Sequence, residues 1–325
     1  MILRRIGGLQ KGIEIGPLSI FLTPSWFQKI EMFKIQFAYG QREILLDYMG
    51  LSRTTLLMGI LQHGLTYGHD SSEVLTPRFP KFERSPLWVY SESRARSLAE
   101  LGHTNVKAIG APWLYLPPIP KSFEVGRNSD RYVVFPIHTS LSVDASPDEN
   151  EIRRKIRIWK SISGDSPITI CLYWSDYLEW SWRRIAKSEG VDVTVLGVPE
   201  TAPVYWSPHS ARIDFLVNLR NLLNENSHAI FETFTSAIFY AIETGTAVGY
   251  FPETQTESES QLHLEADRWF SKEIPGIIGE FVEASTLLDR NNGILGVESL
   301  RSPSELRDLL NYEVGVVPRV DVEST

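Results

Sequence analysis

The sequence predicts an α/β protein of two domains, each built on a parallel sheet covered by helices. Runs rich in β-branched and aromatic residues, typical of buried parallel strands, alternate with helical stretches along most of the chain. Ala111–Asp130, with four prolines followed by polar and turn residues, interrupts the alternation and is predicted to be an interdomain linker. The predicted domains are therefore residues 1–120 and 121–325.

The first half alternates strand and helix signals. The helix near residue 97 is the best defined, because Ser91 or Ser93 can cap its start and Gly102 follows its end. The expected elements are, in order, a strand at 34–40, a helix at 42–51, an apolar run at 54–64, a strand after Pro86, a helix at 93–101 and a strand before Gly110.

The alternation restarts in the second half. The expected strands are 131–137, 167–175, 191–197, 228–234 and 247–251, and the expected helices are 151–161, 176–189, 211–225, 236–244 and 258–270. Strands separated by helices in this way form parallel sheets covered on both faces. We therefore expect two Rossmann-like domains facing a cleft.

Charge and cysteine content limit the function classes. The formal net charge of −8 argues against a nucleic-acid partner. The single cysteine, Cys171, excludes a disulfide framework and a thiolate metal cluster and favours a reducing compartment. No window approaches the ~20 apolar residues of a membrane span, and no signal-peptide pattern opens the chain. We expect a soluble cytoplasmic protein, and peripheral attachment at the inner face of the membrane stays open.

Ligands of parallel α/β sheets bind beyond the carboxyl ends of the strands. Two of the predicted strands of the second half end in hydroxyl-rich loops, which can hold a phosphate together with the N-terminus of the following helix. A third strand ends at Trp174, which could stack on a base. The predicted donor-binding residues are His138, Thr139, Ser140, Trp174, Ser175, Thr235 and Ser236. The alternative for Thr235 or Ser236 is a plain helix cap, but two such loops on one rim suit a nucleotide.

The segment FTSAIFYAIETGTAVGYF, residues 234–251, resembles the C-terminal nucleotide-binding segment of GT-B-fold glycosyltransferases, including bacterial surface-polysaccharide enzymes. Residues 102–110, GHTNVKAIG, resemble the end of their N-terminal half. The resemblance implies a nucleotide-sugar donor bound by residues 121–325, a glycan or lipid-linked glycan acceptor bound by residues 1–120, and no cofactor. It also implies a carboxylate for the ribose, for which Glu243 is the candidate. The sequence departs from the family pattern at Tyr240, where retaining members carry Glu, and at Ala247, where they carry Pro.

The stretch ILQHGLTYGHD, residues 60–70, is predicted to supply the catalytic base. It is similar to a motif of polyol-phosphate polymerases of the same fold, in which the histidine takes the proton. A neutral imidazole can deprotonate an acceptor hydroxyl near pH 7. His63 is the first candidate and Asp70 the second. The alternative is that His63 only holds its loop by hydrogen bonds.

The sequence predicts no metal site, because an Asp-x-Asp motif that would hold a divalent cation against a diphosphate occurs only loosely, at Asp321–Glu323. Phosphate sites built from hydroxyls and His favour a CMP-linked acidic sugar such as Kdo or another nonulosonate, with UDP and CDP open. Three other functions remain: a nucleotide-sugar 2-epimerase, a polyol-phosphate transferase of the same fold, and a non-catalytic nucleotide- or glycan-binding protein.

One predicted helix carries a basic cluster: Arg153, Arg154, Lys155, Arg157 and Lys160. We expect these side chains to form a solvated face of the helix. The alternative is contact with an anionic acceptor or a membrane surface.

Overall fold

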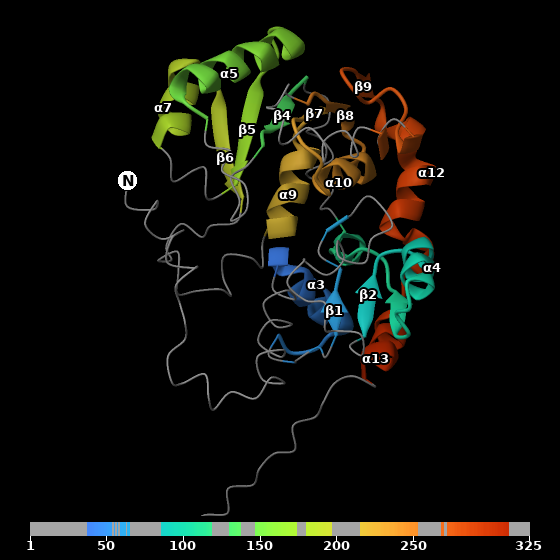
Figure 1. Cartoon of the computed structure of the whole chain (residues 1–325). Helices are drawn as coiled ribbons and strands as arrows, with labels where there is room; N and C mark the ends of the chain where they lie inside the picture. Colours follow the sequence, from blue (N-terminus) through green and yellow to red (C-terminus); the bar gives the residue numbers. More distant parts are fainter. Residues whose placement is uncertain are drawn as a thin grey trace, which may run out of the picture.

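The computed structural model describes residues 38–53, 55, 57, 59–62, 64–65, 86–118, 130–137, 147–173, 180–196, 215–252, 268–269 and 272–311. Within them, a three-stranded parallel sheet and a six-stranded sheet lie one beyond the other, each with helices on its faces (Figure 1). The predicted fold class, an α/β protein with two Rossmann-like sheets facing a cleft, is confirmed. None of the helices in these ranges combines the length and apolar character needed to cross a bilayer.

The first half follows the predicted order. Ser91 caps the helix α4 by accepting a hydrogen bond from the Arg94 amide, and Gly102 lies just beyond its end with φ of 96°. The strand predicted at 34–40 is wrong at Ala38–Gly40, which forms a 3₁₀ turn whose middle residue, Tyr39, has a φ of 58°. The elements are η2 (Ala38–Gly40), α3 (Gln41–Met49), β1 (Ile60–Leu61), β2 (Leu87–Val89), α4 (Glu92–Glu100), β3 (Val106–Ala108) and η4 (Pro112–Tyr115).

The second sheet has the strand order β6-β5-β4-β7-β8-β9, in which β9 alone is antiparallel to its neighbour. Numbered from β4, its first five strands run 3-2-1-4-5, the order of dinucleotide-binding Rossmann sheets. The order reverses between β4 and β7, so the loops after these strands flank the switch point. The strands are β4 (Tyr132–Phe135), β5 (Ile168–Tyr173), β6 (Asp192–Leu196), β7 (His228–Phe231), β8 (Ala247–Tyr250) and β9 (Phe281–Val282).

Helices cover both faces of the second sheet. Adjacent residues of β4 point to opposite faces, so Val134 packs with the helices of one face and Val133 with those of the other. The outer face carries α5 (Glu149–Ser163) and α7 (Trp180–Ser188), and the inner face α9 (Phe215–Asn224), α10 (Ala237–Thr244) and α12 (Ala284–Leu295).

The end of the described chain returns to the first half. After α12, η6 (Val297–Ser299) and α13 (Pro303–Asn311) lie beside α3 and the first sheet (Figure 1). The Ala111 amide donates to the Leu295 carbonyl at 2.8 Å, and the Tyr48 hydroxyl donates to the Arg301 carbonyl at 3.1 Å. The predicted boundary at residue 120 stays a prediction, but the elements after α12 pack on the half that precedes it.

The two halves share one hydrophobic core. Trp113, 1% exposed, stacks on Tyr240 of α10 with ring centroids 4.3 Å apart. The predicted linker is therefore wrong over Ala111–Leu116, which is a buried turn at the interface between the halves. An aromatic-rich segment with its prolines at the edges packs as core, whereas a solvated linker would be polar. Residues 119–129 of the predicted linker lie outside the described residues.

We expect the histidine at the start of β7 to make stability depend on pH. The ring of His228 stacks on Tyr132 at 4.5 Å, and this burial lowers its pKa from the ordinary value of about 6.5. The neutral form is therefore favoured in the folded state. The contribution of neutral His228 to the free energy of unfolding is fully present above the unfolded-state pKa. It is lost as the pH falls below that value. Between pH 7 and pH 5, the unfolding temperature of the wild type should fall by more than that of His228→Phe. Equal decreases in the two proteins would contradict this prediction.

Candidate functional site

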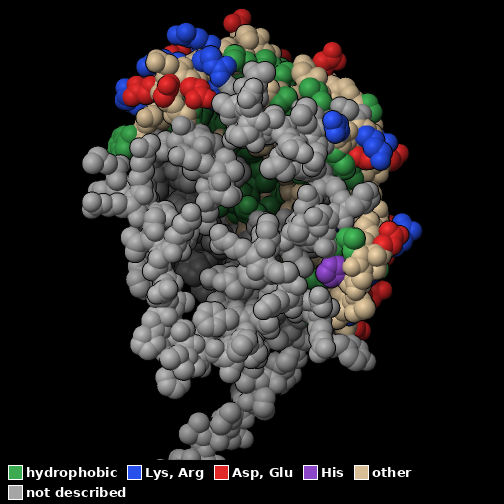
Figure 2. All heavy atoms as spheres, in the orientation of Figure 1, with side chains coloured by type: hydrophobic (Ala, Val, Ile, Leu, Met, Phe, Trp, Pro, Cys, Tyr) green, Lys and Arg blue, Asp and Glu red, His purple; other side chains and the backbone are tan. Residues whose placement is uncertain are grey.

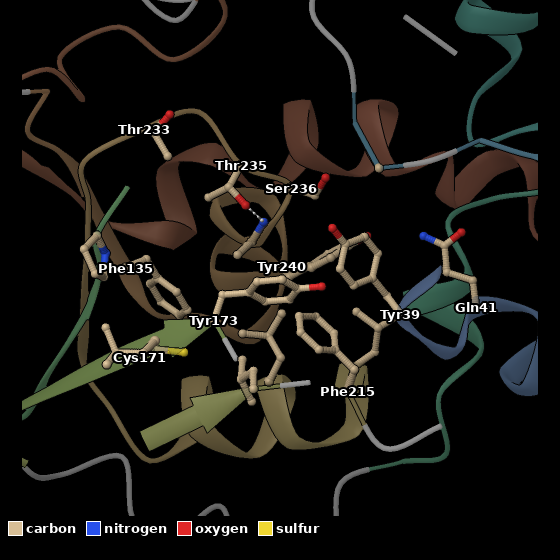
Figure 3. Close-up of a pocket in the computed structure, with 17 residues that line it drawn as sticks. Tyr39, Gln41, Phe135, Cys171, Tyr173, Phe215, Thr233, Thr235, Ser236 and Tyr240 are labelled. Carbon is tan, nitrogen blue, oxygen red and sulfur yellow. Dashed lines mark hydrogen bonds between the residues drawn. The ribbon is translucent and has the colours of Figure 1, made fainter. Parts of the chain in front are cut away.

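A pocket of about 130 Å³ opens where the carboxyl ends of β4, β5 and β6 face the first half. Figure 2 shows a recess with hydrophobic side chains at the centre of this face, and Figure 3 shows the residues that line the pocket. Its lining contains aromatic, aliphatic, amide and hydroxyl side chains and no charged group among the residues described. The first half contributes Tyr39, Gln41 and Gly64, and the second contributes Phe135, Pro136, Cys171, Leu172, Tyr173, Leu196, Phe215, Leu216, Leu219, Thr233, Thr235, Ser236, Ala237 and Tyr240.

The predicted hydroxyl loop lies at this pocket, between β7 and α10. Thr235 and Ser236 line the pocket directly before the first turn of α10 (Figure 3). Ser236 makes no side-chain capping bond to its own helix, so the capping alternative is wrong for this residue. The Thr235 hydroxyl accepts a long bond of 3.4 Å from the Ala237 amide. The next amides, of Ile238 and Phe239, donate to the carbonyls of Thr235 and Ser236, so the capping alternative holds for Thr235. The helix start thus offers the pocket two hydroxyls at the positive end of the α10 dipole, which suits an anion such as phosphate.

The loop after β1 meets the hydroxyl loop across the interface between the halves. The Leu65 amide donates to the Ser236 hydroxyl oxygen at 2.7 Å. Gly64 has a φ of 76°, and a Cβ at this position would lie 2.8 Å from the same oxygen. Gln62 fixes the loop by donating to the Gly64 carbonyl and accepting from the Tyr90 amide. Glycine is thus required at position 64, where the two loops approach each other.

His63 lies in the sequence between these residues, but it is outside the described residues, as is Asp70. Their predicted catalytic roles stay predictions. The structure places the neighbour on one side, Gly64, in the lining of the pocket. The segment that was predicted to bring the base and the segment that was predicted to bind the phosphate are therefore adjacent.

A buried ion pair ties together the two loops at the switch point. Lys155 of α5 lies 2.8 Å from Glu232, with side chains each 5% exposed, and the Ile137 amide donates to the same carboxylate at 3.2 Å. Glu232 follows β7 and Ile137 follows β4, so a single carboxylate spans both loops. The solvated position expected for Lys155 is wrong, because it lies on the face of α5 that buries Ile152 and Trp159, three residues before it and four after it.

Glu243, the predicted ribose-binding carboxylate, lies near the other end of α10 and does not line the pocket. It accepts a hydrogen bond of 2.7 Å from the indole nitrogen of Trp113. Burial lowers the pKa of the nearby Arg220, and Glu243 opposes that shift. Its position beside these two residues gives the carboxylate a contact between the halves, and a role toward ribose stays a prediction.

The remaining predicted donor-binding residues, His138, Thr139, Ser140, Trp174 and Ser175, lie outside the described residues. The strands that precede them end at the pocket. Pro136 after β4 and Tyr173 at the end of β5 both line it. This agrees with the rule that ligands meet the carboxyl ends of parallel strands.

Sequence reasoning missed the aromatic part of the site. Tyr39 and Phe215 form a tilted pair with ring centroids 4.8 Å apart at the pocket wall. Tyr240 reaches it from α10, and burial raises its pKa well above the ordinary value. Burial also raises the pKa of Tyr90, its hydrogen-bond partner, to about 12. Both tyrosines are therefore neutral at physiological pH. Their positions follow from contacts between the halves, which local sequence patterns do not carry.

No family model matches the chain, and no curated protein matches it in sequence. Solved structures do overlap with it, among them the following three, whose TM-scores are below 0.5. Os79 from O. sativa in complex with UDP and deoxynivalenol-3-glucoside has 11% identity, a TM-score of 0.31, and an overlap covering 70% of this chain and 49% of that one. The S. aureus MnaA–UDP co-structure has 12% identity, a TM-score of 0.36, and coverage of 79% and 65%.

The UDP-GlcNAc 2-epimerase from Methanocaldococcus jannaschii has 13% identity, a TM-score of 0.32, and coverage of 70% and 62%. The matches thus span between 49% and 65% of the length of these three proteins. The ligands bound in those structures are not assigned to this chain. The function of this chain has to be argued from its own site.

Proposed function

We propose that this protein binds a nucleotide-activated sugar in the pocket between its two sheets and transfers the sugar to an acceptor hydroxyl. The observation that carries the proposal is the hydrogen bond from the Leu65 amide to the Ser236 hydroxyl. It joins the start of a helix suited to phosphate with the loop that was predicted to hold the base. The GT-B resemblance of residues 234–251 supports the same reading.

In the proposed reaction, the hydroxyls of Thr235 and Ser236, at the positive end of the α10 dipole, bind the phosphate attached to the sugar. The acceptor oxygen attacks the anomeric carbon while His63, or Asp70 in its place, takes the hydroxyl proton. The bond between the anomeric carbon and the phosphate oxygen breaks, and the nucleotide leaves with the electron pair. These hydroxyls and the helix dipole stabilise the charge that develops on the leaving phosphate.

The finer assignment is also a proposal. Hydroxyl donors without a cation in the described lining suit the single phosphate of a CMP-linked Kdo or nonulosonate, with UDP and CDP sugars as the alternatives. The proposed acceptor is a bacterial surface glycan, free or lipid-linked, and the reaction is proposed to run in the cytoplasm or at the inner face of the membrane. No metal ion or cofactor is proposed to take part.

Nucleotides tested one at a time should identify the donor. We expect one of CMP, CDP, UDP, GDP and dTDP to raise the unfolding temperature in a manner insensitive to EDTA, since a ligand at 100 times its Kd adds about 2.7 kcal/mol. Thr235→Val with Ser236→Ala should abolish most of this shift. Ser161→Ala, on the exposed face of α5, is the matched control and should retain it. No shift with any nucleotide would overturn the proposal.

Incubation of the matching nucleotide sugar without an acceptor separates transfer from epimerisation. The proposed transferase leaves the sugar unchanged until an acceptor is added. An epimer formed without acceptor would assign the chain to the 2-epimerases instead. If His63→Ala leaves every activity unchanged, the assigned base is wrong and a binding protein becomes the better reading.

A further inference from the structure

A second hollow lies on the outer side of the second sheet, along α7 and the edge strand β6. Its volume is about 750 Å³, and its walls include Trp180, Arg183, Arg184, Lys187, Asp192 and Val193. We call it the α7–β6 groove. Within the described residues, no strand pairs with the free side of β6. The candidate site uses none of these side chains.

The groove combines an exposed aromatic ring with positive charge. Trp180 is 75% exposed, whereas tryptophan is on average highly buried, so its position marks a contact surface. The Arg183 guanidinium lies 5.2 Å from the centre of its ring, which holds the ring in place by a cation–π contact. Figure 2 shows Lys and Arg side chains gathered over α5 and α7, with acidic side chains among them.

The local charge is opposite to that of the whole protein. Three cationic side chains and one carboxylate line the groove, in a chain of net charge −8. Arg184 also pairs with the half-exposed Glu149 of α5, which offsets part of this positive charge. A cationic surface on an acidic protein attracts a polyanion while the rest of the molecule repels it.

The groove leads toward the candidate site. Val193 of β6 lines the groove and Leu196 of the same strand lines the pocket, about 10 Å further along at ~3.3 Å per residue. Trp180 opens the helix that follows β5, and the end of β5 also lines the pocket. The groove and the pocket therefore lie at neighbouring positions along one strand, close enough for one extended glycan to span both.

We infer that the α7–β6 groove binds the body of an anionic glycan, one bearing carboxylates or phosphates, whose end reaches the pocket as the acceptor. The indole ring stacks on a sugar and the cations pair with its charges. The hollow shape suits a narrow polymer better than a flat bilayer. The acceptor role rests on the proposed function, but binding of the glycan does not.

The test titrates the full chain with oligogalacturonate as the acidic probe and a maltooligosaccharide of equal length as the neutral one. We expect binding to oligogalacturonate that weakens with added salt, and little binding to the neutral probe. Trp180→Ala should weaken it at least about tenfold, as for a tryptophan anchor of an interface. Replacing Arg183 and Lys187 by Gln should weaken it and reduce its salt dependence.

The matched controls lie at α4: Arg96 is an exposed residue within the helix, and Leu101, 52% exposed, follows its last residue. Leu101→Ala and Arg96→Gln should bind oligogalacturonate like the wild type. Equal affinity of Trp180→Ala and Leu101→Ala would overturn the inference. The inference would also be overturned if the protein bound vesicles of phosphatidylglycerol and phosphatidylcholine through Trp180 and did not bind oligogalacturonate. If the nucleotide still raises the unfolding temperature of Trp180→Ala, the pocket of that variant is intact. A failure of glycan binding can then be told apart from a failure of the proposed function.

Discussion

Lys155→Met is expected to lower the free energy of unfolding by about 3–5 kcal/mol, because it leaves the buried Glu232 carboxylate without its cation. The methionine keeps most of the apolar stem, so the loss comes from the charge and not from a cavity. Thermal unfolding at neutral pH measures it, with a midpoint change of roughly 2–4 °C per kcal/mol for a domain of this size. The rise in unfolding temperature that the nucleotide causes should also become smaller, since Glu232 spans the two loops at the switch point.

The double variant Lys155→Met with Glu232→Gln should recover most of this stability. Its neutral amide oxygen can still accept the hydrogen bond from the Ile137 amide. The control is Arg53→Met, which breaks the half-exposed pair with Asp47 and should cost about 1 kcal/mol or less. If the buried and the exposed single variants lose the same stability, the ion pair does not hold the loops as described.

Gly296→Ala is expected to destabilise the protein by about 2–5 kcal/mol, from overpacking and left-handed strain together. Gly296 follows α12 with a φ of 73°, and a Cβ there would lie 1.8 Å from the Tyr90 carbonyl oxygen. The substitution therefore forces the turn away from the end of β2. Thermal unfolding measures the loss.

Gly293→Ala provides a matched control only three residues earlier. Gly293 lies inside α12, and a Cβ there meets nothing within 4 Å. Alanine should therefore stabilise the helix by about 0.4–1 kcal/mol. Changes in stability of opposite sign for the two substitutions would establish the tight contact at Gly296. Changes of the same sign would contradict it.

Local patterns predicted the regular elements well. Every strand from β2 to β8 was expected at or within a few residues of its position, because each is a short apolar run between turn residues. Ser91 as the cap of α4 was also predicted correctly. These features depend on neighbours in sequence, which is the information that periodicity and capping rules use.

What the sequence did not predict depends on contacts between distant residues. Lys155 reads as one member of a basic cluster, and only its spacing from Ile152 and Trp159 marks it as buried. Trp113 reads as part of a proline-rich linker, although it stacks on a tyrosine 127 positions later. Of the predicted site, Thr235 and Ser236 lie at the pocket and Glu243 lies away from it.

The return of η6 and α13 to the first half has a consequence for synthesis. Leu306 and Leu310 complete the core around α3, and Leu295 supplies the acceptor for the Ala111 amide. A nascent chain that has just emerged with its first sheet therefore lacks the residues that cover it. Since domains usually fold as they leave the ribosome, N-terminal first, this protein has to keep its first sheet incompletely covered until Leu310 has been synthesised.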